Sequence, residues 1–513
     1  MAPIVPLATS SASVSRPPTT ILPPTAETPS FLITSANKSY KHQYANIYFV
    51  RLRILRDVVE ENARRRWQGI KGDPVLVPKV LEVEKSQLCY IVGTAYMDMP
   101  LKPNVMEDIA RDNSIPPPPP LSKFYSPDDN IMLEDESGRI QLVGERIVGA
   151  RLVTGVIIAA LGIETPTGEF EVVDICYAEM APQPKQEVEA EAKMDVDAEP
   201  QTDTWIALLS GLDIGSTSPA DAQIQMLVEY LTGEEGGPKE QVSAAQISRL
   251  VIAGDSLAPV VISAKSDSFE EKEGKKGRRY GYDATSFSPH PTLSLSAHLL
   301  DIGRTMPVHL LPGETDPSGV ILPQQPFPRA MFGAVSTYGS FSCETNPTYL
   351  RIGSETGSEP TRTLLVNSGQ PLNDMFKYVP SPPNTPLSLL ESTVRWRHMA
   401  PTAPDTLWCH PYFSADPFLI SQTPDLYIVG GQQRFGTKMI VEKGEDDVEK
   451  RCRLVLVPRF ADTGTLVLVN LRTLDVKCVK FGVKGMSGSS DDRARAEPDA
   501  SLPSTQLNPK PPT

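Results

Sequence analysis

Three apolar runs of strand length stand out in the pattern of hydrophobic and polar positions along the chain. They lie at residues 205–211, 250–254 and 308–313, and each ends in glycine. Carboxylates follow these runs at Asp213, Asp255, Glu314 and Asp316. Short apolar runs bounded by turn-forming residues predict buried parallel strands. Because ligands of open α/β folds bind beyond the carboxyl ends of such strands, the pattern predicts a site where the three runs end.

The first folded element predicted by the pattern is an amphipathic helix at about residues 43–68. Tyr48, Leu52, Leu55 and Val59 recur at helical spacing and define the buried face. The wetter face is predicted to carry the arginines Arg51, Arg53, Arg56, Arg64, Arg65 and Arg66. A basic helix of this kind could touch nucleic acid, but a solvated or partner-facing surface is the commoner outcome.

Residues 74–180 carry β signals. Predicted strands lie at 75–83, 88–97, 131–133, 140–143, 147–162 and 170–177, with one helix at 105–112. The turn between 133 and 140 contains glycine, which indicates a hairpin. Five or so strands with one helix between them predict a small Greek-key barrel of the OB type. Such barrels often bind single strands on aromatic side chains, but only Tyr90 and Tyr96 are candidates here, so a structural or protein-binding barrel is favoured.

The rest of the chain completes a predicted domain map. Helices are expected at 221–232, 293–304 and 387–398, and a hairpin pairs 453–458 with 465–471. The map is a disordered tail (1–34), the helix and barrel (35–181), an acidic linker (182–204), a second domain (205–484) and another disordered tail (485–513). A basic, disordered insertion is expected at 264–291 within the second domain.

Composition limits the classes of function. The 513 residues carry a net charge of −14, which argues against a protein that binds phosphate backbones with its whole surface. The six cysteines are scattered without a Cys-x-x-Cys motif, as expected of buried thiols in a reducing compartment. No apolar run approaches the ~20 residues of a membrane span, and the start of the chain lacks the pattern of a secretory signal. A soluble intracellular protein is expected.

The strand-end motifs resemble the calcineurin-like metallophosphoesterase family, which carries Asp-x-His, Gly-Asp-x-x-Asp and Gly-Asn-His-Asp/Glu after successive strands and a later Gly-His-x-His loop. A site for two metal ions needs several imidazoles beside a bridging carboxylate. Asp213, Asp255 and Asp316 match carboxylate positions, but none of the six histidines falls on a ligand position. The positions that depart from the pattern are Gly215, Ala258, Glu314, Thr315, Gln432 and Gln433. The resemblance implies an inactive site without metal or cofactor, in which the remaining carboxylates could hold one hard cation weakly.

The predicted fold class is therefore a multidomain α+β and α/β chain: an N-terminal OB-type barrel followed by a calcineurin-like phosphoesterase αββα sandwich. This order resembles the B-subunits of eukaryotic replicative DNA polymerases. The stretches that narrow the resemblance to the small subunits of DNA polymerase delta are 92–104, 211–215, 311–317 and 395–408.

The resemblance implies a nuclear scaffold subunit for DNA replication and repair without catalysis of its own. Its implied partners are the C-terminal metal-binding module of the catalytic subunit and a third, elongated subunit. The resemblance also implies that the subunit belongs to the polymerase zeta complex and that its contact with DNA is indirect or weak. Candidate partner contacts are the aromatic residues Trp396, Trp408, Tyr412 and Phe413, although these rings could equally cap the domain's own core. Two other hypotheses remain open at this point: a divergent metal-dependent phosphodiesterase and a single-strand-binding barrel.

Overall fold

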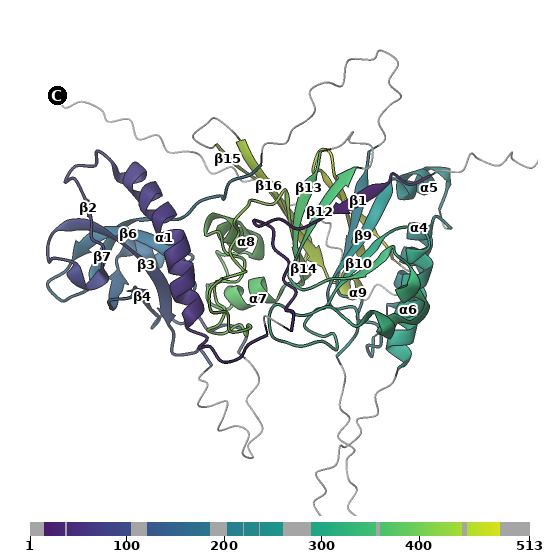
Figure 1. Ribbon diagram of the computed structural model, residues 1–513, viewed down its shortest axis with the longest axis horizontal. Helices are drawn as coiled ribbons and strands as arrows, with labels where there is room; N and C mark the ends of the chain where they lie inside the picture. Colours follow the sequence, from purple (N-terminus) through teal and green to yellow (C-terminus); the bar gives the residue numbers. More distant parts are fainter. Residues whose placement is uncertain are drawn as a thin grey trace, which may run out of the picture.

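The computed structural model describes residues 15–35, 38–103, 121–184, 203–218, 220–234, 236–259, 289–354, 360–443 and 449–482. Within these ranges the chain forms three six-stranded sheets, one in a barrel and two in a layered second domain (Figure 1). The predicted helix at 105–112 and the tail at 485–513 lie outside the described residues, as do most of the acidic linker and of the basic insertion. No helix in the described part of the chain is long and apolar enough to cross a membrane.

The N-terminal sheet closes on itself, as a barrel requires. Its strands are β2 (Val75–Leu76), β3 (Leu88–Asp98), β4 (Asn130–Glu134), β5 (Arg139–Val143), β6 (Ile157–Glu164) and β7 (Phe170–Cys176). β3 is long enough to pair with β4 along one part and with β6 along another, and these pairings close the ring. Helix α1 (Asn46–Trp67) packs Leu52, Leu55 and Val59 against β3 and β6. The predicted barrel, helix and β4–β5 hairpin are confirmed.

Two strand predictions in the barrel were wrong in extent. Residues 147–162 do not form one strand, because helix α3 (Glu145–Val148) and an irregular turn precede β6. Gly155 has a φ of +92°, which takes the chain out of the extended region there. Residues 75–83 likewise contain only the short β2 and a single 3₁₀ turn, η1 (Val80–Glu82).

The second domain contains two six-stranded sheets, which we call sheet I and sheet II. Sheet I has the order β11 (Phe341–Cys343), β10 (Val308–Leu311), β9 (Ile247–Ala253), β8 (Trp205–Leu209), β17 (Thr465–Asn470) and β18 (Val476–Lys480). Sheet II has the order β1 (Thr19–Leu22), β12 (Thr348–Ser354), β13 (Arg362–Asn367), β14 (Leu426–Gln432), β16 (Glu449–Pro458) and β15 (Gly436–Lys443). Both sheets mix parallel and antiparallel pairs.

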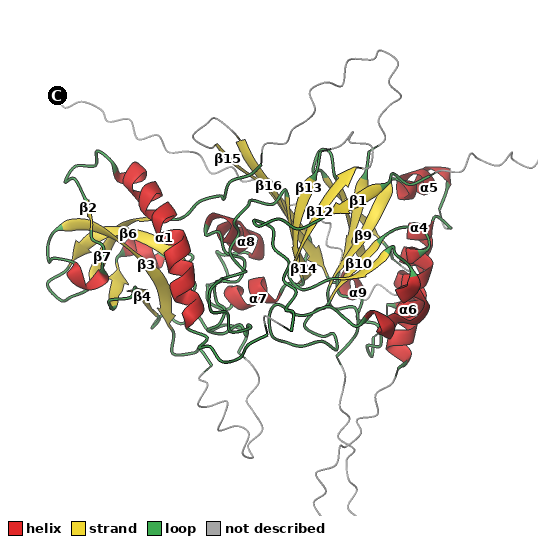
Figure 2. Cartoon of the chain, in the orientation of Figure 1, coloured by secondary structure: helices red, strands yellow, loops and turns green. Residues whose placement is uncertain are grey.

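The two sheets pack face to face between two layers of helices (Figure 2). Successive side chains of a strand point to opposite faces, so Ile206 and Leu208 of β8 contact sheet II while Ala207 and Leu209 contact the outer helices. The helices beside sheet I are α4 (Asp221–Thr232), α5 (Pro238–Ala245), α6 (His290–Gly303) and the 3₁₀ segment η2 (Arg329–Thr337). Those beside sheet II are α7 (Gln370–Phe376) and α8 (Pro386–Arg395). The predicted helices at 221–232, 293–304 and 387–398 correspond to α4, α6 and α8.

The predicted hairpin between 453–458 and 465–471 was wrong. β16 belongs to sheet II and β17 to sheet I, and the short helix α9 (Phe460–Thr463) joins them across the edge of the sandwich. Phe460 is fully buried, and its backbone N–H donates to the Ser210 carbonyl at 2.7 Å. Two apolar strands with a glycine turn between them can form either a hairpin within one sheet or a connection from one sheet to the other. The buried position of Phe460 favours the connection between sheets.

The predicted N-terminal tail also needs correction, because residues 15–34 are ordered against the second domain. β1 is an edge strand of sheet II and pairs with β12. Arg16 donates to the carbonyls of Ala244 and Ile247, and Phe31 is buried and stacks on Tyr349. The segment has few apolar residues, but an open sheet edge supplies backbone hydrogen bonds that composition does not reveal.

Candidate functional site

The parallel register of sheet I brings the predicted strand ends together. β8 pairs with β9, and β9 with β10, all in parallel. Beyond the strands, the backbone N–H of Asp213 donates to the carbonyl of Asp255 at 3.2 Å, and that of Thr315 donates to Oδ1 of Asp255 at 3.0 Å. The structure therefore gathers Asp213, Asp255, Thr315 and Asp316 at one edge.

An arginine that the sequence interpretation missed occupies the centre of this edge. Arg459 follows β16, and its guanidinium donates to Oδ2 of Asp213 and, at 3.2 Å, to Oδ2 of Asp255. We call Arg459, Asp213 and Asp255 the strand-end arginine cluster. Gly211 permits the approach, because a Cβ there would lie 2.8 Å from the Cβ of Arg459. The available signal was an arginine directly after an apolar strand, Val457-Pro458.

The carboxylates of this edge differ in their surroundings. Asp316 is buried and accepts from the backbone N–H groups of Leu257 and Gly313, each at 2.8 Å. Burial raises the pKa of Asp316 to about 6 in spite of these hydrogen bonds. Burial also raises the pKa of Asp213, and the hydrogen bond and charge of Arg459 oppose that shift. Asp316 thus serves the loop backbone, and Asp213 is paired with a cation supplied by the chain.

The side chains at the other predicted positions do not point towards a common centre at this edge. A Cβ on Gly215 would meet Cγ of Pro291 at 2.6 Å, so a larger side chain does not fit there. Gln432 turns away to Asn373 and to the Gly430 carbonyl. Ala258 is half-buried, and Glu314 and Gln433 are exposed. Among the described residues, no group of three or more His, Cys, Asp or Glu is placed to hold a metal ion.

A buried cluster of amide side chains lies next to this edge and was also missed. Asn346 Nδ2 donates to Gln324 Oε1 at 2.6 Å and to Gln370 Oε1 at 3.0 Å, and it also contacts Ser368. Gln324 Nε2 donates to the carbonyl of Gly313, at the end of β10. Neutral amides that satisfy one another fix the loops without offering charge to a ligand.

A second arginine cluster holds the barrel against the second domain. Arg51 of α1 was predicted on the wet face, but it is fully buried. Its Nε donates to Asp416 Oδ2 at 2.8 Å, and its other nitrogens donate to the carbonyls of Gly155, Pro401 and Ala403 at 2.7–3.0 Å. Helical spacing placed Arg51 beside other arginines, but it could not show that carbonyls from the second domain lie opposite.

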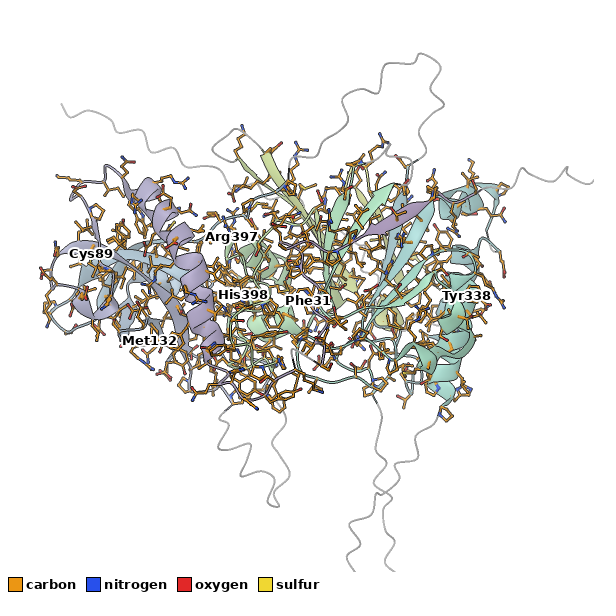
Figure 3. The ribbon with its side chains drawn as sticks, viewed as in Figure 1. Phe31, Cys89, Met132, Tyr338, Arg397 and His398 are labelled. Carbon is orange, nitrogen blue, oxygen red and sulfur yellow. The ribbon has the colours of Figure 1, made fainter. Side chains whose placement is uncertain are left out.

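His398 completes this arrangement, and we call Arg51, Asp416 and His398 the interdomain arginine cluster. His398 lies between α1 and the sheets (Figure 3). Its Nδ1 accepts the N–H of Ala400 at 3.1 Å, so Nε2 carries the proton and donates to Asp416 at 2.8 Å. Burial and the charge of Arg51 lower the pKa of His398 to about 4. Burial by itself raises the pKa of Asp416, but His398 and Arg51 outweigh it and lower that pKa well below its usual range.

The four aromatic candidates for partner contact separate into two pairs. Trp396 is 2% exposed and belongs to the core shared with α7 and α8, so its prediction as a contact residue was wrong. Tyr412 is half-buried and packs against the same core. Trp408 and Phe413 are 66% and 61% exposed. Only these last two offer a free aromatic surface.

Comparisons with known proteins agree with this architecture. A family model described as the DNA polymerase delta subunit OB-fold domain matches residues 43–175, and a model for the B-subunit of DNA polymerases alpha and epsilon matches residues 206–437. The DNA polymerase delta small subunit of Arabidopsis thaliana is 37% identical, over 86% of this chain and 92% of the plant protein. That of Saccharomyces cerevisiae is 34% identical, over 88% of this chain and 92% of its own length. DNA polymerase delta subunit 2 of Drosophila melanogaster is 31% identical over 86% and 94%. The chain belongs to the family of DNA polymerase delta small subunits.

Proposed function

We propose that this accessory subunit of the replicative DNA polymerase delta is a scaffold built on a phosphoesterase fold that has lost its metal chemistry. The observation that carries the proposal is Arg459, whose guanidinium bonds both Asp213 and Asp255. A phosphoesterase needs those carboxylates for cations that activate water. A guanidinium keeps its single positive charge at any working pH, and it has no coordination site through which it could lower the pKa of a water molecule as a metal ion does.

The layered arrangement of the second domain supports the αββα phosphoesterase ancestry. Two mixed sheets lie between helices, and the carboxylates follow the parallel strands β8, β9 and β10. The loops of the former cleft are held by the amide cluster around Asn346 and by Asp316. Rigid loops of this kind suit a docking surface better than a site that must admit substrate.

The proposed partners are those that family membership suggests. They are the C-terminal metal-binding module of the polymerase delta catalytic subunit and a third, elongated subunit, with polymerase zeta as a further complex. Work in DNA replication and repair would place the protein in the nucleus. Of the four aromatic candidates for partner contact, Trp408 and Phe413 are the two whose side chains are largely exposed, and they are the proposed contact residues.

The proposal is tested by two measurements on the full-length chain. Co-expressed with the catalytic subunit of its own organism, it should purify in a stoichiometric complex. Alone, it should not hydrolyse bis(p-nitrophenyl) phosphate or tailed DNA in Mn²⁺ or Mg²⁺. Asp255→Ala is the matched control, because hydrolysis by the wild type that vanishes in this variant would establish an active phosphoesterase and contradict the proposal.

The single-strand-binding alternative loses support at the barrel. Tyr90, one of its two candidate aromatics, is 5% exposed and lies beneath Trp67 of α1. The basic residues of α1 are largely committed to acids of the same domain: Arg56 pairs with Glu136, and Arg66 with Asp174. Paired arginines of this kind release few counterions on binding a phosphate backbone.

A further inference from the structure

An exposed apolar strip lies where the barrel meets the second domain. Its members are large apolar side chains with high exposure: Leu32 51%, Tyr40 59%, Tyr44 49%, Val320 66%, Trp408 66% and Phe413 61%. We call these six residues the aromatic strip. Isolated apolar residues on a surface are ordinary, whereas a contiguous group marks an interaction site.

Contacts of neighbouring residues hold the three segments that carry these side chains next to one another. The ring of His42 stacks on Phe413 at 4.5 Å, and Tyr40 meets His410 edge to face at 5.2 Å. The Leu322 N–H donates to the Trp408 carbonyl at 2.9 Å, which joins the segment of Val320 to that of Trp408. Asn46 of α1 donates to the carbonyl of Phe413.

The part of the strip around Phe413 adjoins the interdomain arginine cluster in the chain. Asp416 is three residues beyond Phe413, and it is fixed by Arg51 on one side and His398 on the other. Aromatic side chains on a backbone that is already fixed lose little conformational entropy when a partner binds. Such pre-organised Trp, Tyr and Phe side chains are typical of the centre of a protein interface.

Charge identifies the kind of partner. The segments that carry the strip, residues 28–56, 317–343 and 406–415, contain no aspartate or glutamate, in a chain whose net charge is −14. Lys38 and Lys41 flank Tyr40 in the sequence, are exposed and form no ion pair with the described residues. Glu27, Asp57 and Glu314 are exposed just outside these segments, whereas Lys38 and Lys41 lie within the first of them. An apolar surface with such cations is complementary to a segment that combines acidic and apolar side chains.

We propose that the aromatic strip docks an acidic, apolar segment of another polymerase delta subunit, an inference that rests on the proposed function. A polypeptide is favoured over a nucleic acid because Leu32 and Val320 contribute aliphatic surface, which bases do not use for stacking. Trp408 and Phe413 are the expected anchors, and Lys38 and Lys41 orient the acidic residues of the partner.

The test uses the full-length chain, co-expressed with the remaining subunits of polymerase delta from its own organism. Trp408→Ser combined with Phe413→Ser should lower the affinity for one of those subunits by about tenfold or more, measured by titration of the purified proteins. The matched control is Leu81→Ser combined with Val148→Ser, which removes two exposed apolar residues from the barrel (67% and 87% exposed) and should bind normally. Unchanged circular-dichroism melting establishes that both double variants fold.

The outcomes distinguish a failure of the proposed function from a failure of the aromatic-strip proposal. If the wild type binds none of the other subunits, the proposed function fails and this inference fails with it. If the Trp408→Ser, Phe413→Ser variant binds all of them as the wild type does, only the aromatic strip is refuted. A fluorescent oligo(dT) titration completes the test: binding by the wild type that the strip variant loses would assign the surface to nucleic acid and overturn the polypeptide partner. Lys38→Glu with Lys41→Glu should weaken binding of the partner by about threefold to tenfold, and tighter binding would contradict an acidic partner.

Discussion

The strand-end arginine cluster and the interdomain arginine cluster both pair an arginine with aspartate, but they do so in different environments. Arg459 pairs with three carboxylates, those of Asp213, Asp255 and the exposed Asp462, and keeps 26% of its own side chain exposed. Arg51 bonds one carboxylate and three carbonyls, and neither it nor Asp416 retains any exposed surface. The first partly offsets the negative charges at the edge of a sheet, and the second joins two domains.

Burial decides how strongly each cluster affects stability. Water screens an ion pair at the surface, so such a pair contributes little. A buried pair is expensive to break, because removing one partner leaves the other charged and desolvated. The interdomain arginine cluster should therefore dominate the stability of the whole chain, whereas the strand-end arginine cluster should matter more for what the edge can bind.

The largest expected effect comes from Asp416→Ala. It leaves Arg51 charged in a fully buried position, so the free energy of unfolding should fall by about 3–5 kcal/mol. Urea unfolding followed by circular dichroism measures the change. The matched control is Asp301→Ala, which breaks the exposed Arg304–Asp301 pair and should cost no more than about 0.5 kcal/mol. A loss for Asp416→Ala as small as that of the control would show that the cluster does not join the domains.

The second prediction concerns pH. The pKa of His398 falls from 6.5 to about 4 on folding, so the unfolded chain takes up a proton first as the pH drops. The contribution of His398 is complete above pH 6.5 and is lost progressively as the pH falls towards 4, by roughly 3 kcal/mol. Thermal melts of the wild type and His398→Gln across this range measure it. The stability of His398→Gln should depend less on pH, and equal slopes would refute a neutral buried histidine.

A smaller change is expected from Arg459→Ala. The cluster is partly exposed, so the loss of stability should be about 1–2 kcal/mol. The variant leaves Asp213 and Asp255 without their shared cation, and millimolar Mg²⁺ should then raise its melting temperature by mass action but leave the wild type unchanged. Adding Asp213→Ala to the variant should abolish the response to Mg²⁺. A wild type that responds equally would mean that Arg459 does not occupy the place of a cation.

The smallest effect is expected from Glu314→Ala. This carboxylate stands at the strand end, but its side chain is exposed. The free energy of unfolding should change by less than about 0.5 kcal/mol, and Mg²⁺ should not alter the outcome. A loss comparable to that of Arg459→Ala would extend the strand-end arginine cluster to Glu314.

Particular residues show how far sequence reasoning reached. The apolar runs at β8, β9 and β10 and the carboxylates after them were predicted correctly, because strand periodicity and glycine turns are local signals. The β16–β17 hairpin was wrong because the same local signals fit a strand pair and a crossing between sheets. Arg459 was missed and Arg51 was predicted on the wrong face of its helix, because a cation's role depends on what lies opposite it, and no local pattern contains that.

The sequence by itself determined the alternation of strands and helices, the order of a barrel before a layered domain, and the absence of histidine from the motifs after the three strands. Tertiary structure alone decided which arginine meets which carboxylate. Arg459 and Asp213 are 246 residues apart, and Arg51 and Asp416 are 365 residues apart. Contacts at such separations are set by sheet topology and by the packing of one domain on another, which side-chain periodicity does not encode.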